Sequence, residues 1–526
     1  MRMKQQLSLI GFILFVAAAS LTAQERIAHV EIRPDSAFTG RGNANEVLFR
    51  LMIELPGDRP VAIRRIAWRK HPETEIADVR ALKVYTTAAS DTFDTRYPDR
   101  ARCLGTTTLK EGEQQLTLSG KLAPGPNYLW ITADVASDAR EGRCIALLPE
   151  YIECSRLGRI DLSRQDYSVR GREILLARKL LFAPGDYGSV SYRIPALITA
   201  ADGSLITLTD RRKYNDIDLP EDIDIVCRRS EDGGYTWSEP HRVAEGKGRG
   251  AGFGDAVLMR TKAGKLVALF VGGPGLWAST PGHPNRCYII SSSDDGRTWT
   301  TPRDITDAFY GSNCPDSVRS RWRGAFFGSG QGLCLKNGRI MAVLAVRETE
   351  EYLLNNYAVY SDDEGETWQV SAKALDRGDE AKVVELDNGD VLMSSRRQGS
   401  RLWALSKDGG QNWIGRGHWE EIWGNACDAD MIRYNLPQDG KPGRLLHTLP
   451  NAPDRRKLSM WLSYDEGRSW PLKKLICPGS SAYSSICVLP DGSIGVYYEE
   501  DETSPCFRMY FIRFSLDWLE GPKMKP

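Results

Sequence analysis

From about Gln24 to Arg178, apolar and polar residues alternate in short runs that proline and glycine interrupt. The stretches AHVEIRP, VLFRLMIEL and NYLWITADV are examples. Alternation with a period of two places one face of a strand in a core and the other face in solvent. The pattern predicts a small, separate β-sandwich over residues 24–178.

Beyond this region, a motif of the form Ser-x-Asp-x-Gly-x-Thr-Trp recurs five times, as SEDGGYTW, SSDDGRTW, SDDEGETW, SKDGGQNW and SYDEGRSW. Consecutive copies are separated by 62, 69, 45 and 57 residues, which suits a four-stranded sheet with loops of variable length. We predict a six-bladed β-propeller over residues 179–526, with the strand KLLFAP pairing with the final MYFIRFSL. The predicted fold class is all-β, a six-bladed β-propeller preceded by a small β-sandwich.

We interpret the repeated turn as structural. Its aspartate would accept hydrogen bonds from backbone amides, its glycine would adopt a positive φ, and its tryptophan would pack between sheets. A turn repeated in every sheet cannot form one active site. We therefore exclude these aspartates from the catalytic candidates: Asp232, Asp294, Asp363, Asp408 and Asp465.

The first residues have another pattern. Two basic residues precede an apolar run from Leu7 to about Ala19, and small residues follow as far as Ala23. This pattern predicts a cleaved secretory signal over residues 1–23, because the run is short for a membrane-spanning helix. We expect an exported protein, periplasmic or secreted, with no membrane span after cleavage.

Composition restricts the possible partners. The 526 residues are 41% hydrophobic and 26% charged, as in globular chains of two or three domains. With 69 basic and 69 acidic residues, the chain has no net charge to attract nucleic acid. The eleven cysteines include no pair at metal-ligand spacing, so we expect no metal site, and their odd number leaves at least one thiol unpaired.

Charged residues inside strand-like runs are candidates for ligand binding. Arg193 lies in GSVSYRIPAL, among aromatic and β-branched residues. An unpaired buried guanidinium costs several kcal/mol, so this residue needs a carboxylate partner or an anionic ligand. Similar positions on other predicted blades are held by Arg396 in VLMSSRRQ, Arg455 and Arg456 in APDRRKLSMWLS, and Glu499 in IGVYYEED.

From about Leu180 to the C-terminus, the chain resembles the bacterial and animal sialidases, or neuraminidases. YRIP, the five turn motifs, EAKVVELDNGDVLMSSR and AYSSICVLPDGSIGVYYE occur in the order of that family. The region before Leu180 resembles, more weakly, the lectin-like N-terminal domain of some secreted sialidases. The resemblance implies a retaining exo-α-sialidase that removes terminal sialic acid from glycoproteins, glycolipids and oligosaccharides without a metal or cofactor.

The resemblance also implies roles for the strand arginines. Arg193, Arg396 and Arg455 correspond to a triad that binds the substrate carboxylate, and Glu499 to the acid that holds Arg193. Planar guanidinium groups suit this task because they bind a carboxylate in a bidentate manner. Arg456 remains an alternative to Arg455, since adjacent residues of a strand face opposite sides and only one can point to the site.

Tyr483 in SSAYSSI resembles the family's nucleophile, and Glu380 resembles the base that deprotonates it. A neutral phenol avoids the repulsion that a carboxylate nucleophile would meet from an anionic sugar. The acid/base aspartate would lie in the loop DRRKYNDIDLPEDIDIVCRRS. Counting along this loop gives Asp218, with Asp216 and Asp222 as alternatives.

We expect the acidic loop to raise the pKa of its most buried carboxyl group, as a general acid working near neutral pH requires. Arg212, at the start of the loop, resembles an arginine that many family members place near the sugar's hydroxyl groups.

Two other functions remain open. A trans-sialidase would share all of these residues, and a non-catalytic propeller that binds glycans would not need the complete set. The expected partners are sialylated glycans, and we expect a monomer that binds no nucleic acid.

Overall fold

The computed structural model describes residues 29–35, 37–163, 171–438, 440–501 and 506–521. Within these residues, 37 strands accompany two short α-helices, α1 (Thr306–Phe309) and α2 (Leu516–Glu520). The predicted all-β class is confirmed. The predicted signal at residues 1–23 lies outside the described residues, and none of the described helices is long and apolar enough to cross a membrane.

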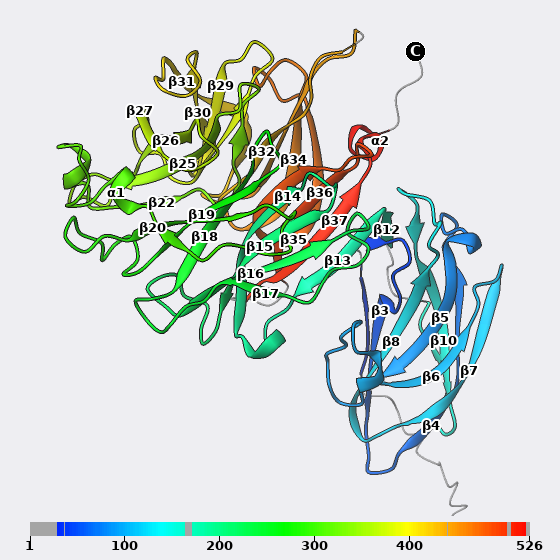
Figure 1. Ribbon diagram of the computed structural model, residues 1–526. Helices are drawn as coiled ribbons and strands as arrows, with labels where there is room; N and C mark the ends of the chain where they lie inside the picture. The colour runs from blue at the N-terminus through cyan, green and yellow to red at the C-terminus, as the bar shows by residue number, and fades with distance from the viewer. Residues whose placement is uncertain (1–28, 36, 164–170, 439, 502–505, 522–526) are drawn as a thin grey trace, which may run out of the picture.

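The N-terminal part, drawn in blue and cyan in Figure 1, contains three sheets. Their strand orders are β1-β3-β8-β5-β6, β11-β10-β4-β7 and β2-β12-β9. The strand bounds are β1 (His29–Pro34), β2 (Thr39–Gly40), β3 (Glu46–Leu55), β4 (Val61–Lys70), β5 (Val79–Thr86), β6 (Arg102–Thr107), β7 (Glu113–Leu122), β8 (Gly125–Val135), β9 (Cys144–Ile145), β10 (Leu147–Cys154), β11 (Gly158–Asp161) and β12 (Arg172–Leu175).

The predicted alternation of apolar and polar residues builds the core of this part. In β7, Gln114, Leu116 and Leu118 are buried while the residues between them are exposed. One hydrophobic cluster, which includes Trp68 of β4 and Leu51 of β3, draws on both of the larger sheets. The two sheets therefore share a single core.

The C-terminal part contains five sheets, shown from green to red in Figure 1. Four of them are β14–β17, β18–β21 with β23, β22 with β24–β27, and β28–β31. The strand bounds are β13 (Ala177–Phe182), β14 (Ser191–Thr199), β15 (Leu205–Arg212), β16 (Ile223–Ser230), β17 (His241–Ala244), β18 (Phe253–Arg260), β19 (Leu266–Gly272), β20 (Arg286–Ser292), β21 (Arg303–Asp304), β22 (Gly324–Phe327), β23 (Gly330–Gln331), β24 (Leu333–Cys334), β25 (Ile340–Arg347), β26 (Asn355–Ser361), β27 (Gln369–Leu375), β28 (Ala381–Glu385), β29 (Val391–Ser395), β30 (Gly399–Ser406), β31 (Gly415–Gly424), β32 (Met431–Asn435), β33 (Arg444–Pro450), β34 (Arg456–Ser463), β35 (Leu472–Val488), β36 (Ile494–Asp501) and β37 (Arg508–Phe514).

The fifth sheet has seven strands, in the order β13-β37-β36-β35-β34-β33-β32. Its long strand β35 pairs with β34 through residues 472–480 and with β36 through residues 480–488. The sheet therefore consists of two four-stranded units that share β35. The predicted pairing of KLLFAP with MYFIRFSL is confirmed, because β13 pairs with β37, and the predicted boundary at Arg178 falls inside β13.

The repeated turns have the predicted hydrogen bonds. After β20, Thr298 donates its N–H to Asp294 Oδ1 (2.9 Å) and its hydroxyl to Oδ2 (2.6 Å), and Gly296 has φ +81°. Trp368 of the third motif is buried in a cluster formed by two neighbouring sheets. The motif thus fixes a turn and fills a gap between sheets. The same carboxylate bonds occur at Asp232, Asp363, Asp408 and Asp465.

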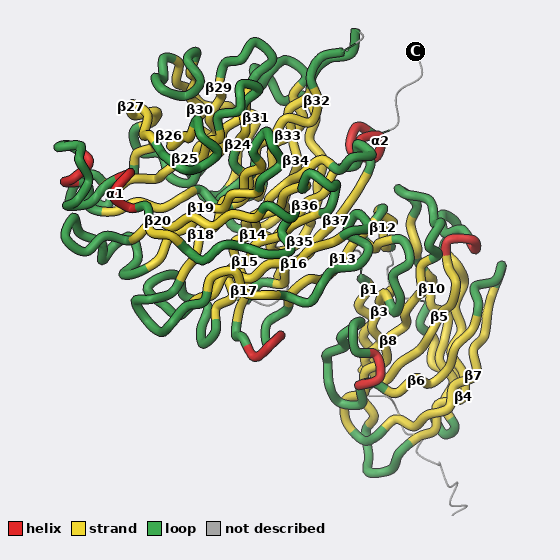
Figure 2. The backbone as a smooth tube through the Cα atoms, viewed as in Figure 1, coloured by secondary structure: helices red, strands yellow, loops and turns green. Residues whose placement is uncertain are grey.

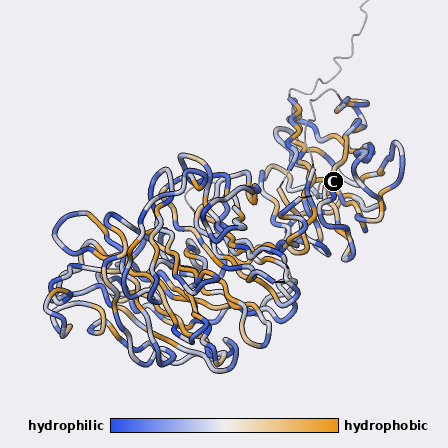
Figure 3. The backbone as a smooth tube through the Cα atoms, turned by 90° about the horizontal axis from the view of Figure 1, so that it is seen from above, coloured by the Kyte–Doolittle hydropathy of each residue, from blue (hydrophilic) through white to orange (hydrophobic). Residues whose placement is uncertain are grey.

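The two parts of the chain lie side by side and meet near the C-terminal helix (Figures 1 and 2). Ser515, which caps α2, donates its hydroxyl to Glu141 of the N-terminal part (2.5 Å), and Trp518 donates its ring N–H to Glu173 (2.7 Å). In both parts, hydrophilic segments are frequent at the periphery and hydrophobic segments are frequent toward the interior (Figure 3).

Candidate active site

Charged residues from several sheets meet where the first strand of a sheet begins and its antiparallel neighbour ends. Arg193 lies near the start of β14, and Arg212 ends β15. Glu380 precedes β28, and Arg396 follows the neighbouring β29. Antiparallel pairing places both ends of each pair at one edge of the sheet. β14 also packs against β35, which carries Tyr483.

Arg193 has a carboxylate partner. It donates from Nε to Glu499 Oε1 (3.0 Å) and from Nη2 to Glu499 Oε2 (2.8 Å). Glu499 is fully buried and also accepts the backbone N–H groups of Ile194 (2.8 Å) and Tyr483 (3.1 Å). Burial disfavours the charged guanidinium, but the Glu499 carboxylate outweighs it and raises the pKa of Arg193. Glu499 thus holds both the cation and the strand that carries Tyr483.

Tyr483 and Glu380 form a hydrogen-bonded pair although 103 residues separate them. The phenol hydroxyl lies 2.7 Å and 2.8 Å from the two carboxylate oxygens of Glu380. Arg396 donates from Nη1 to Tyr483 Oη (2.8 Å) and to Glu380 Oε2, and its Nε lies 3.4 Å from Asp379. The phenol therefore lies between a carboxylate and a guanidinium.

The environment of this pair shifts both pKa values. Burial raises the pKa of the Glu380 carboxyl group to about 7, while Arg396 opposes the shift and Asp428 adds to it. Burial also raises the pKa of the Tyr483 phenol well above its ordinary value of 10, although Arg396 opposes this shift. Glu380 is thus a carboxylate basic enough to accept a phenol proton as that phenol reacts.

Arg455 and Arg456 point in different directions. The Arg455 guanidinium lies over the Tyr483 ring, with its carbon 5.5 Å from the ring centroid. Arg456 is exposed and pairs with Asp454 (2.9 Å). The structure therefore brings Arg455, and not Arg456, to the face of Tyr483.

Asp218 lies at the same site, but the rise in pKa expected for the most buried acid of the loop occurs at Asp210, whose pKa burial raises to about 8, and not at Asp218. Its carboxylate pairs with Arg212, and 76% of the side chain is exposed. The surrounding protein partly desolvates the carboxylate, which tends to raise its pKa, but the charges of Arg212, Arg193 and Arg455 outweigh this effect and lower it. The acids of the loop do not decide the pKa of Asp218 alone, because Arg212 at the start of the loop and Arg193 and Arg455 from elsewhere in the chain lower it.

The two alternatives to Asp218 lie elsewhere in the loop. Asp222 pairs with Lys213 (2.8 Å). For Asp216, the contact with Arg212 is made by the backbone carbonyl. Arg212 is itself buried, so the Arg212–Asp218 pair joins the loop to the sheet.

Sequence reasoning missed two acids at this site. Asp255, near the start of β18, has a left-handed backbone (φ +58°) and interacts electrostatically with Asp218 and Glu380. Asp210 of β15 is buried and interacts with Arg212 and Asp218. Burial raises the pKa of Asp210 and of Asp255. The only sequence signal was an acid beside each apolar run, LITLTD and DAVLM.

A buried ion pair stands close to the base. Lys382, two residues beyond Glu380, lies 2.7 Å from Asp428, and both side chains are 2% exposed. Ser329 also donates to Asp428 (2.9 Å). Across the described ranges, no group of three or more His, Cys, Asp or Glu residues is placed to hold a metal ion. The site therefore offers cations for an anion, a phenol with a base, and an exposed aspartate.

Comparisons with known proteins relate the chain to sialidases. Residues 219–496 match the family model described as a BNR repeat-like domain. The chain is 32% identical to a sialidase of Micromonospora viridifaciens in an alignment of 401 positions that covers 68% of this chain and 54% of that protein. It is 28% identical to a sialidase of Bacteroides fragilis in an alignment of 436 positions that covers 75% of each chain. This chain thus spans about half the length of the Micromonospora protein.

Solved structures show the same fold. The Hadza microbial sialidase Hz136 matches with a TM-score of 0.72 and 22% identity, over 93% of this chain and 99% of that chain. The intramolecular trans-sialidase of Ruminococcus gnavus matches with a TM-score of 0.54 and 19% identity, over 66% of this chain and 98% of that one.

Proposed function

Because this chain belongs to the sialidase family, we propose that it is a retaining exo-α-sialidase that hydrolyses terminal sialic acids from glycoproteins, glycolipids and oligosaccharides. The observation that carries the proposal is the position of Tyr483 Oη, within 2.8 Å of both Glu380 oxygens and of Arg396. Two further arginines, Arg193 and Arg455, lie over the same phenol ring.

Substrate binding would use these three arginines. Sialic acid carries a carboxylate on its anomeric carbon, and planar guanidinium groups bind a carboxylate through paired charge-assisted hydrogen bonds. Arg193 is oriented by Glu499, and Arg396 by Glu380 and Asp379. The guanidiniums would therefore be fixed before the ligand arrives, which reduces the ordering cost of binding.

In the first step, Tyr483 Oη attacks the anomeric carbon while its proton passes to Glu380. The bond from this carbon to the glycosidic oxygen breaks, and Asp218 donates a proton to the departing oxygen. A tyrosyl-linked sugar results. In the second step, Asp218 takes a proton from water, the resulting hydroxyl attacks the same carbon, and the phenolate recovers its proton from Glu380. Two displacements at one carbon retain its configuration.

Asp218 must be protonated to begin this cycle, although arginines lower its pKa in the free site. We propose that the substrate carboxylate raises the pKa of Asp218. Once it binds Arg193 and Arg455, its negative charge offsets the charges that stabilise ionised Asp218, and it adds a like charge close by. Substrate binding would thus raise the pKa of the acid when a proton is needed.

The wider architecture belongs to the same proposal. We propose that the four-stranded units between residues 179 and 526 are the six blades of a propeller, and that residues 24–178 form a β-sandwich. A boundary between the two parts at residue 176, instead of 178, places all of β13 in the C-terminal part. We further propose that residues 1–23 direct export to the periplasm or beyond the cell, and that the mature protein is a monomer.

The proposal is tested with 3′-sialyllactose and purified protein. Chromatography should detect sialic acid and lactose in equal amounts, and proton NMR should show the α-anomer of sialic acid first. A trans-sialidase would instead transfer the sugar to added labelled lactose. A non-catalytic glycan-binding protein would leave the substrate intact. Initial release of the β-anomer would contradict retention.

A further inference from the structure

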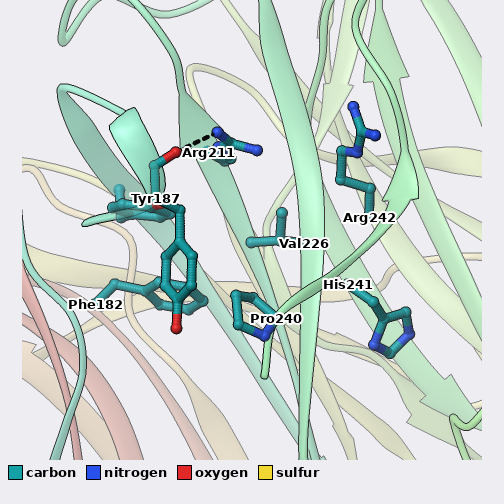
Figure 4. A pocket seen from close by; sticks show the side chains of 8 residues that line it. Phe182, Tyr187, Arg211, Val226, Pro240, His241 and Arg242 are labelled. Atoms are coloured by element: carbon teal, nitrogen blue, oxygen red, sulfur yellow. Dashed lines mark hydrogen bonds between the residues drawn. The ribbon is translucent and has the colours of Figure 1, made fainter. Parts of the chain in front are cut away.

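A cavity of about 250 Å³ lies beside the first sheet of the C-terminal part (Figure 4). Tyr192 of β14 and Arg211 of β15 are cross-strand partners that line it, whereas their neighbours Arg193 and Arg212 belong to the active site. Successive residues of a strand point to opposite faces. The cavity therefore faces away from the catalytic residues, across the same two strands.

One wall of the cavity is a fixed aromatic ring. Tyr187 is 47% exposed and has φ +50°, a left-handed backbone that is strained for a residue with a side chain. Its hydroxyl donates to Glu239 (2.7 Å) and accepts from Arg228 (2.8 Å), and its carbonyl accepts from Arg211 (2.6 Å). Two hydrogen bonds at the hydroxyl and one at the backbone carbonyl thus fix a tyrosine whose ring is half exposed.

The opposite wall is polar and comes from the edge strand β17. Figure 4 shows His241 and Arg242 across from Tyr187 and Phe182, with Pro240 between them. His241 Nε2 is buried and has no hydrogen-bond partner among the described residues. Burial lowers the pKa of His241, which favours the neutral ring. The half-exposed Arg242 is thus the polar group that this wall presents to a ligand.

The charges around the cavity balance. Arg242 pairs with Glu245, and the Arg211 guanidinium lies 3.7 Å from Asp224. An acidic ligand would gain little from cations that already have partners. A flat aromatic face and compensated charges suit a neutral ring that carries hydroxyl groups.

We propose that this cavity is a non-catalytic site for one neutral hexopyranose unit of a glycan. The sugar ring would lie on Tyr187, and its hydroxyl groups would bond to Arg242. The volume is below the roughly 300–1,000 Å³ of drug-sized ligand sites, which suits one sugar ring. Arg96 of the N-terminal part anchors the same loop through Asp186 (2.6 Å), so the site lies where the two parts meet.

Saturation-transfer NMR with lactose and the full chain tests the proposal. We expect saturable binding with a dissociation constant in the millimolar range. The Tyr187→Ala substitution should weaken it at least tenfold, and Arg242→Gln, which changes a half-exposed side chain, should weaken it several-fold. The matched control is Tyr352→Ala, which removes another exposed aromatic ring (81%) and should not change binding. Thermal melting verifies that each variant is folded.

Four results would overturn the proposal: no saturable lactose binding, an unchanged dissociation constant in Tyr187→Ala, equal weakening in Tyr352→Ala, or Tyr187-dependent binding of N-acetylneuraminic acid alone. The site does not depend on the proposed activity. Hydrolysis of a small aryl sialoside by Tyr187→Ala should equal that of the unmodified protein. Absence of hydrolysis in both would count against the proposed function and leave the lactose result unaffected.

Discussion

Replacement of Arg193 by lysine keeps the positive charge and removes the planar fork. The native guanidinium uses Nε and Nη2 on Glu499, at 3.0 Å and 2.8 Å. The ammonium group of a lysine at this position can retain at most one of these two bonds to the Glu499 carboxylate. One charge-assisted hydrogen bond contributes about 1.5–3 kcal/mol, so stability should fall by that amount. Glu499 keeps two backbone donors, Ile194 and Tyr483, and the fold should survive.

The effect on turnover should be larger than the effect on stability. Loss of a bidentate pair of hydrogen bonds to the substrate carboxylate removes about 3–6 kcal/mol, or at least about 100-fold in kcat/KM. Hydrolysis of a fluorogenic aryl sialoside measures this loss, and Arg456→Lys serves as an exposed control that should stay within twofold. A kcat/KM for Arg193→Lys within about threefold of the unmodified protein would refute the carboxylate clamp.

Other substitutions test the remaining roles. Tyr483→Phe should melt normally and lose more than about 100-fold in turnover, since it removes the reacting oxygen, and retained activity would remove the phenol from the mechanism. Asp218→Ala should slow 3′-sialyllactose far more than an aryl sialoside, because only the poor leaving group needs a proton, and equal losses would argue against an acid role. The kcat/KM should fall as the pH drops and Glu380 becomes protonated, with an apparent pKa near 7 on the acidic side of the profile. An apparent pKa at or below 4.5, the ordinary value of a glutamate, would contradict a buried base. Arg455→Lys should raise KM strongly while Arg456→Lys does not, and the reverse would exchange their assignments.

The repeats and the alternation predicted the all-β fold, because they depend on local geometry. Turn hydrogen bonds such as those of Asp294 close within four residues, so a short motif contains everything that defines them. The boundary at Arg178 was less accurate, since β13 belongs to a sheet whose other strands come from the end of the chain.

The site was harder to predict for a physical reason. Tyr483 and Glu380 are 103 residues apart, and no local pattern indicates that they touch. Only the resemblance to a family placed them together. Asp210 and Asp255 were missed because an acid at a strand end usually faces solvent, and only the packed sheets bury them.

The pKa of Asp218 shows the same limit. The loop around it is rich in acids, and the sequence suggested mutual repulsion. Two of the arginines that lower its pKa lie outside this loop, Arg193 on β14 and Arg455 just before β34. A titration property of one residue thus depends on contacts that the order of residues does not contain.

In the proposed mechanism, Tyr483 forms a covalent bond to the sugar. Treatment with 2,3-difluorosialic acid, which carries its own leaving group and slows the second step, should trap that bond. Mass spectrometry of peptides should then find one sugar per chain on the Tyr483 side chain, and none in the Tyr483→Phe variant. A label on Asp218, on Glu380, or on any peptide that lacks Tyr483 would contradict the account.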